Sequence, residues 1–219
     1  MAIGQTSAQM AIRDPDIRLM LRVRDDDQAA FSDLVDRYQN RLVGVMHHLV
    51  NNAEEAEDLA QEVFMRVFRT RKKYTPKAKF STWLFTIANN LALNTLRNRQ
   101  RKPVVALDVH DSGPLGPRPA EQLVHNYRDA APSTSLQHAE LTARIRMALG
   151  KLNDRQQMAV ILNKFEDMGY AEIAEVMGLT SKAVKSLLSR ARARLREELR
   201  DYVYMDGEAM PNAADANSA

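Results

Sequence analysis

The residues with the clearest chemical potential form two basic blocks that lie far apart in the chain. Eleven lysines and arginines and no acidic residue occur within residues 66–102. Residues 180–200 hold seven basic and two acidic residues, whereas residues 1–65 hold twelve acids and six bases. This segregation, which a net charge of +3 conceals, predicts two polyanion-binding surfaces and one surface suited to a basic partner.

Several other chemistries are disfavoured by the residue types. The chain has no cysteine, which excludes disulfides, iron–sulfur clusters and thiolate zinc sites. His47 and His48 have no carboxylate at metal-ligand spacing, and residues 25–27 lack the glycine and terminal glutamate of a calcium loop. There is no glycine-rich phosphate loop and no nucleophile–base constellation. We therefore expect no catalytic residue, no metal, no cofactor and no enzymatic activity.

The chain also lacks the apolar segments that membranes require. No apolar run approaches the roughly 20 residues of a membrane helix. Residues 1–13 have neither the basic start nor the apolar stretch of a signal peptide. We expect no membrane insertion and a cytoplasmic location, which the absence of cysteine fits.

The segment YAEIAEVMGLTSKAVKSLLSRARARL, residues 170–195, has the spacing of a helix-turn-helix. Ile173 and Met177 repeat at the helical period, and the small Ala174 lets two helices approach closely. Gly178 falls four residues later, where the tight turn requires a left-handed backbone. The alternative is a plain helical hairpin with a solvated basic face, but agreement at several positions favours the helix-turn-helix.

The second helix of this motif places polar and basic side chains between its apolar positions. In a recognition helix, such positions near the N-terminal half contact base edges and phosphates of duplex DNA. The predicted contacts are Ser181, Lys182, Lys185, Ser186, Ser189 and Arg190.

Apolar periodicity predicts an all-α fold of two small helical domains joined by a flexible linker, the second domain ending in the helix-turn-helix. The domains span residues 15–102 and 138–200. Residues 103–137 carry five of the eight prolines and no sustained apolar period, which is typical of a linker. Residues 201–219, rich in Asn, Ala and Asp, are expected to be a disordered tail.

Three segments together resemble the extracytoplasmic-function (ECF) group of sigma-70 family RNA polymerase sigma factors. They are FSDLVDRYQNRLVGVMHHLVNNAEEAEDLAQEVFMRVFRT (31–70), FSTWLFTIANNLALNTLRNRQRK (80–102) and LNDRQQMAVILNKFEDMGYAEIAEVMGL (152–179). The resemblance implies a bacterial alternative sigma factor that binds core polymerase and directs promoter-specific transcription initiation. Residues 15–102 would be a region 2-like domain and residues 138–200 a region 4-like domain.

The resemblance assigns a partner to the acidic part of the chain. In the family, the helix containing AEEAEDLAQEVFMRVF docks on a coiled coil of the polymerase β′ subunit. No lysine or arginine lies between Leu42 and Met65, and carboxylates there can pair with a basic partner. The implied docking residues are Glu54, Glu57, Asp58, Gln61, Glu62 and Phe64.

Residues 66–102, the basic block without an acidic residue (the acid-free block), resemble the family element that opens and reads the downstream (−10) promoter element. Holding unstacked single strands requires a cationic groove with flat side chains or a pocket for a flipped base. The implied −10 residues are Lys79, Trp83, Asn90, Asn94, Arg97 and Arg101. The helix-turn-helix would read the upstream (−35) element, although Leu187 stands where many relatives have Arg.

The linker passes a geometric test of this assignment. Two reading heads about two turns of DNA apart lie roughly 70 Å from one another. Thirty-five extended residues reach at most about 115–125 Å, so the linker can span the distance.

Two other functions are weighed against the sigma factor. One is a helix-turn-helix regulator that does not join the polymerase, which would have no use for the acidic helix. The other is a nucleic-acid enzyme with an appended binding domain, which the missing catalytic constellation disfavours. The expected partners are the β′ and β subunits of core RNA polymerase and promoter DNA. Family members are commonly restrained by an anti-sigma factor, and the sequence leaves open whether this chain has one.

Overall fold

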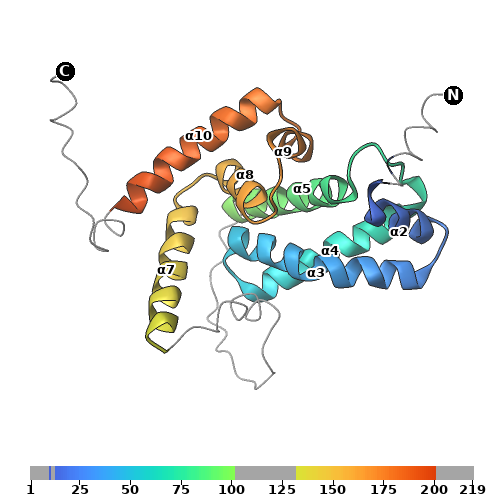
Figure 1. Ribbon diagram of the computed structural model, residues 1–219, viewed down its shortest axis with the longest axis horizontal. Helices are drawn as coiled ribbons and strands as arrows, with labels where there is room; N and C mark the ends of the chain where they lie inside the picture. The colour runs from blue at the N-terminus through green and yellow to red at the C-terminus, as the bar shows by residue number, and fades with distance from the viewer. Residues whose placement is uncertain (1–9, 11–12, 102–131, 201–219) are drawn as a thin grey trace.

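The computed structural model of the chain describes residue 10 and residues 13–101 and 132–200 (Figure 1). In these residues it contains eight α-helices, one short 3-10 turn and no strand, which confirms the all-α class. None of the described helices is long and apolar enough to cross a membrane.

The N-terminal domain consists of four α-helices and a 3-10 turn. They are α2 (Pro15–Arg24), α3 (Gln28–Val50), α4 (Ala53–Thr70), η1 (Arg71–Lys73) and α5 (Phe80–Arg101). The Asp27 carboxylate caps α3 by accepting from the Ala30 N–H (3.1 Å). Asn51, in the left-handed region with φ +53°, ends α3 and allows α4 to pack back against it.

The C-terminal domain consists of α7 (Pro132–Gly150), α8 (Asp154–Lys164), α9 (Tyr170–Met177) and α10 (Ser181–Glu198). Helix α7 begins six residues before the predicted boundary, so residues 132–137 are helical and the prediction of a linker up to residue 137 was wrong at that end. A proline is accommodated in the first turn of a helix because the N–H it lacks has no helical partner there. The rest of the predicted linker and the tail lie outside the described residues.

Two aspartates near the start of the chain join α2 to other helices. The Asp14 carboxylate caps α2 and also accepts from the Phe80 N–H (3.0 Å), which fixes the beginning of α5. Asp16 accepts from Arg37 (2.7 Å) and from the Tyr38 hydroxyl (2.6 Å) on α3. These acids serve internal contacts, so the surface available to a basic partner is narrower than the charge count indicates.

Helix α5 is the part of the N-terminal domain that packs against helices of both domains (Figure 1). One side of it packs on α2, α3 and α4, and another side packs on α8 and α9. Phe80, Leu84, Phe85, Ala88 and Ala92 are all buried along this helix. The two helical domains therefore share one continuous apolar core among the described residues, whereas the sequence predicted two small domains joined only by a flexible linker.

A second contact between the domains surrounds the end of α3. The His48 ring lies 4.5 Å from the Phe165 ring, centroid to centroid, and its backbone carbonyl accepts from the Gln157 side chain (2.5 Å). Burial lowers the pKa of His48 to about 4, and the neighbouring His47 and Arg146 act in the same direction. His48 is therefore neutral in the folded chain across the whole physiological range.

Acidification should weaken the fold through His48. The pKa of His48 in the folded chain lies below that of a free imidazole. Its contribution to the free energy of unfolding is therefore fully present above pH 6.5. This contribution is lost as the pH falls, because the unfolded chain takes up a proton. Between pH 7 and pH 5, wild type should lose about 2 kcal/mol more free energy of unfolding than His48→Gln. Urea unfolding at the two pH values measures this difference.

Comparison with His48→Gln is needed because burial raises the pKa of Glu166, which acts in the opposite direction near pH 5. The control is His47→Gln, which removes a less buried imidazole and should keep most of the pH dependence. Equal pH dependence in His48→Gln and wild type would contradict the assignment of this loss of stability to His48.

Candidate nucleic-acid interface

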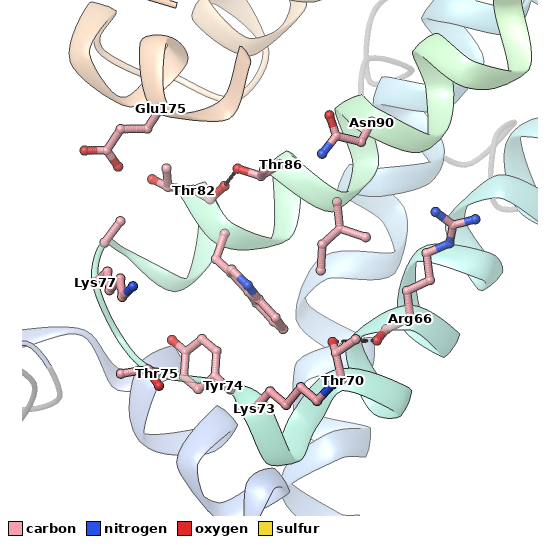
Figure 2. Close-up of a pocket in the computed structure, with 13 residues that line it drawn as sticks. Arg66, Thr70, Lys73, Tyr74, Thr75, Lys77, Thr82, Thr86, Asn90 and Glu175 are labelled. Carbon is pink, nitrogen blue, oxygen red and sulfur yellow. Dashed lines mark hydrogen bonds between the residues drawn. The ribbon is translucent and has the colours of Figure 1, made fainter. Parts of the chain in front are cut away.

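A cleft of about 680 Å³ opens between the end of α4, the segment that follows it and the exposed side of α5 (Figure 2). Three basic side chains, Arg66, Lys73 and Lys77, line it together with Trp83 and Asn90. The cleft thus combines positive charge, a flat aromatic ring and an amide, which are the components that bind an unstacked nucleic-acid strand.

Trp83 belongs partly to the core and partly to the cleft. Its ring meets the buried Tyr74 edge to face, with centroids 4.8 Å apart, and lies 5.9 Å from the Phe80 ring. The indole is only half-buried and lines the cleft. This packing already holds the ring in one orientation. Little side-chain entropy is therefore lost when a base stacks on it, which favours binding.

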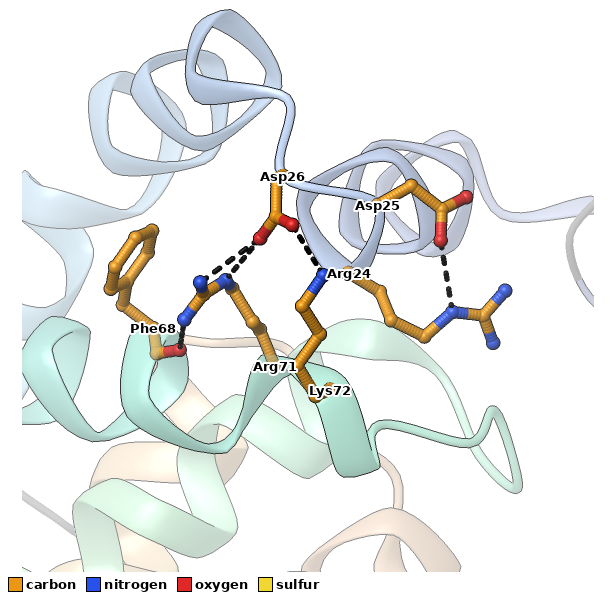
Figure 3. A network of polar contacts seen from close by, with 6 residues as sticks. All are labelled: Arg24, Asp25, Asp26, Phe68, Arg71 and Lys72. Carbon is orange, nitrogen blue, oxygen red and sulfur yellow. Dashed lines mark hydrogen bonds and ion pairs between the residues drawn. The ribbon is translucent and has the colours of Figure 1, made fainter.

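Internal ion pairs decide which lysines and arginines of residues 66–102 face the solvent without an acidic partner. Asp26, in the turn between α2 and α3, binds Arg71 (2.9 Å) and Lys72 (2.5 Å) at η1 (Figure 3). This pairing lowers the pKa of Asp26. By contrast, neither Lys73 nor Lys77 forms an ion pair with any residue that the structure describes, and both are exposed at the cleft.

The six predicted −10 residues differ in where the structure places them. Trp83 and Asn90 line the cleft, whereas Asn94 and Arg97 are exposed on the following turns of α5. Lys79 is not part of the lining, because its ammonium binds the Glu172 carboxylate of α9 (2.8 Å). Arg101 ends α5, and the structure does not describe its side chain.

Among the lining residues that sequence reasoning missed are the three basic ones, Arg66, Lys73 and Lys77. They were counted in the basic block but not assigned to the site. The proline-containing segment between two packed helices was the available signal, since such a segment must return close to the next helix.

The helix-turn-helix has the predicted turn. Gly178 adopts φ +63° and ψ +39°, and the Leu179 N–H donates to the Ala174 carbonyl (2.8 Å) across the turn. The Thr180 hydroxyl accepts from the Ala183 N–H (3.2 Å) and so caps α10. Leu187 is buried in the core, so this position does not face outward.

The six predicted −35 residues are all exposed on α10, which lies along the outer edge of the molecule (Figure 1). Four apolar side chains on the opposite face of α10 are buried: Val184, Leu187, Leu188 and Ala191. The helix is thus anchored on one side and presents a polar, basic face on the other, as docking in a major groove requires.

Helix α4 presents a narrower face than the sequence indicated. Glu54, Asp58 and Gln61 are exposed at helical spacing, and Met65, half of whose surface is exposed (48%), continues the same row. An exposed apolar side chain beside carboxylates favours contact with a partner protein. Sequence reasoning did not single out Met65, although it falls four residues after Gln61.

The other three predicted docking residues of α4 are turned away or engaged. Phe64 is buried against Phe31, with ring centroids 6.5 Å apart, so it positions the helix and its assignment to the docking face was wrong for this structure. Glu62 pairs with Arg66 (2.8 Å), which lowers its pKa. Glu57 is half-buried, with one carboxylate oxygen enclosed and unbonded.

These surfaces define an all-α protein with a basic aromatic cleft, an exposed basic face on the second helix of a helix-turn-helix, and one helix with an exposed acidic face. The family model "Sigma-70 region 2" matches residues 34–102, and "Sigma-70, region 4" matches residues 142–195. The ECF RNA polymerase sigma factor SigW of Bacillus subtilis is 33% identical over 82% of this chain and 94% of its own length. The RNA polymerase sigma-H factor of Pseudomonas aeruginosa is 31% identical over 87% and 96%.

Two solved structures share the fold. CnrH, in complex with the cytosolic domain of CnrY, superposes with a TM-score of 0.60 at 23% identity, over 89% of this chain and all of that one. RpoE of Bartonella quintana, bound to the anti-sigma factor NepR, gives 0.57 at 23% identity, over 78% and 96%. The chain belongs to the sigma-70 family, in its ECF group.

The turn of the helix-turn-helix yields a matched test at two glycines. An alanine at Gly178 would meet no atom within 4 Å, so its cost is the strain of a side chain at positive φ. Gly178→Ala should destabilise the chain by about 1–2 kcal/mol. Gly150→Ala, also in open space but without a positive φ, should leave stability within about 0.5 kcal/mol of wild type. Urea unfolding of both variants decides, and equal effects would contradict the strain argument.

Proposed function

We propose that this chain is an alternative sigma factor that binds core RNA polymerase in the bacterial cytoplasm and directs promoter-specific transcription initiation. The polymerase supplies the catalysis. The observation that carries the proposal is the presence, in one sigma-70 family chain, of a cationic aromatic cleft and a separate exposed recognition helix. Each suits a different form of DNA.

The cleft beside α5 would hold the melted −10 strand. Lys73 and Lys77 supply charge for the backbone, and Trp83 supplies a ring for stacking. Base–aromatic stacking contributes about 1–3 kcal/mol per base and works for every base. Asn90, which can donate and accept hydrogen bonds, is the lining residue best suited to read a base edge. Asn94 and Arg97 would continue the contact along the helix.

Helix α10 would read the −35 element as duplex. Its exposed lysines, serines and arginine lie on the first three turns, where a recognition helix meets base edges. The burial of Leu187 means that promoter specificity at this helix comes from its neighbours, above all Lys185, Ser186 and Arg190.

Helix α4 would dock on the β′ subunit through its exposed row of Glu54, Asp58, Gln61 and Met65. The rest of the chain would make further contacts with the β subunit. Carboxylates facing a basic partner set its orientation and raise the association rate. We also place an anti-sigma factor among the partners, since the related RpoE is seen bound to NepR.

A helix-turn-helix regulator that acts without the polymerase is the alternative. Such a protein needs α10 but neither the acidic row of α4 nor an aromatic cleft. Run-off transcription with reconstituted core polymerase on genomic promoter fragments separates the two functions. We expect promoter-dependent transcripts, and a chain that neither binds core enzyme nor supports transcription would exclude the sigma function.

Substitutions on α10 should impair one step alone. Lys185→Ala and Arg190→Ala should each weaken binding of the holoenzyme to upstream duplex DNA by about 1–3 kcal/mol, the range of a lost base contact. Affinity for core enzyme should not change. Arg196→Ala, on the same helix but beyond the N-terminal half, serves as the control and should have a smaller effect.

Charge reversal on α4 should have the converse effect. Glu54→Lys combined with Asp58→Lys should slow association with core polymerase, most clearly at low salt, while upstream DNA contacts are retained. Asp33→Lys combined with Asp36→Lys reverses two exposed charges on α3 and should leave association close to wild type. Surface plasmon resonance with immobilised core enzyme measures both, and equal rates for the two variants would argue against the docking face.

A further inference from the structure

A second cavity, of about 350 Å³, lies between the end of α3, the end of α7 and the start of α8. It shares no lining residue with the cleft beside α5, and none of the predicted −35 residues belongs to it. Its apolar wall consists of Leu49, Met147 and Leu152. Met147 is exposed over 69% of its surface, so an occupant would cover an apolar side chain that now faces solvent. The volume falls at the lower end of the range of small-molecule sites.

Two enclosed nitrogen atoms of this cavity have no partner. They are the Arg146 Nε and the His48 Nδ1, and neither forms a hydrogen bond within the part of the chain that the structure describes. Arg146 also forms no ion pair with any described residue. A buried donor without an acceptor is costly, so a ligand that supplies acceptor oxygens here would recover that free energy.

The charges around the cavity narrow the class of ligand. Burial and the charge of Arg146 lower the pKa of His47, and burial, His47 and Arg146 lower the pKa of His48 to about 4. Both rings therefore lie within the field of a guanidinium that no carboxylate neutralises. A planar guanidinium binds a carboxylate through two parallel hydrogen bonds.

Asp154 sets an upper limit on the charge of the ligand. It is the one acid among the described residues that line the cavity. Its carboxylate repels a second negative charge on an occupant, and the apolar wall disfavours an inorganic ion. The cavity therefore suits a molecule with one negative charge and an apolar body.

We propose that this cavity binds a small organic acid, whose carboxylate bonds to Arg146 and His48 and whose apolar part lies against Leu49, Met147 and Leu152. The site goes beyond the proposed function, because it uses none of the residues assigned to DNA or polymerase. A ligand that binds only the folded chain stabilises it by mass action. The stability of the protein would therefore rise with the concentration of such an acid.

The test titrates the isotope-labelled full chain with benzoate and follows its amide NMR signals. Benzoate should shift signals within residues 47–51 and 146–157, with a dissociation constant of about 1 mM for a fragment of this size. Benzamide has the same shape without the charge, and it should bind at least about tenfold more weakly. Equal affinity for the two probes, or shifts confined to other parts of the chain, would overturn the inference.

Replacing the cation of the cavity should remove binding. Arg146→Met keeps most of the side-chain length without the charge and should weaken benzoate binding by about tenfold or more. The matched control is Arg155→Met, which removes an exposed arginine of α8 that does not line the cavity and should leave the affinity unchanged. Equal affinities of the two variants would overturn the inference.

Replacing the acid of the cavity should instead increase affinity, which a misfolded chain could not show. Asp154→Asn leaves the α8 cap at Asn153 in place and should bind benzoate about threefold more tightly. It should also bind the dianion phthalate, which wild type should bind about tenfold less tightly than benzoate. An unchanged preference between benzoate and phthalate in Asp154→Asn would overturn the inference.

The His48 ring gives a readout that binding elsewhere would not move. A carboxylate beside it would oppose the effect of His47 and Arg146, with Asp154 on the same cavity in both states, and would raise the pKa of His48. Ring NMR signals titrated between about pH 5 and pH 7, where benzoate is ionised, measure this change. A His48 titration that saturating benzoate leaves unaltered would overturn the inference.

Discussion

The packing of α5 between two sets of helices is the constraint on which the rest of the structure depends. Its inner residues complete the core of α2, α3 and α4, and its first N–H is fixed by Asp14. The same helix carries Trp83 and Asn90 on its cleft side and buries Asn89 against α9. The candidate nucleic-acid site, the core of the N-terminal domain and the contact with α9 therefore share one element.

Internal neutralisation explains why a strongly segregated sequence yields only small charged surfaces. Asp26 engages Arg71 and Lys72, and Glu62 engages Arg66. Exposed pairs of this kind contribute little to stability. Their larger effect is to select which charges stay available: Lys73 and Lys77 among the basic residues at the cleft, and Glu54 and Asp58 among the acidic residues of α4.

The two reading elements make unequal demands on the fold. Helix α10 needs only one anchored face, so its outer face is presented whether the domains are together or apart. The cleft needs the end of α4, the segment after it and α5 at once, and its mouth is shared with Glu175 of the other domain. In the proposed function, upstream binding is therefore a local property of α10, whereas downstream binding depends on several elements at once.

The sequence by itself determined the helices, the left-handed turn at Gly178, the exposed face of α10 and the family. The first three depend on residues within a few positions of one another, where helical periodicity and turn chemistry act, and the family resemblance depends on three such segments taken together. Only the tertiary structure showed that Phe64 faces the core, that Lys79 is bound by Glu172, and that Arg66, Lys73 and Lys77 gather around Trp83. Lys79 and Glu172 lie far apart in the chain, so their pairing depends on how whole helices pack, which local residue spacing does not record.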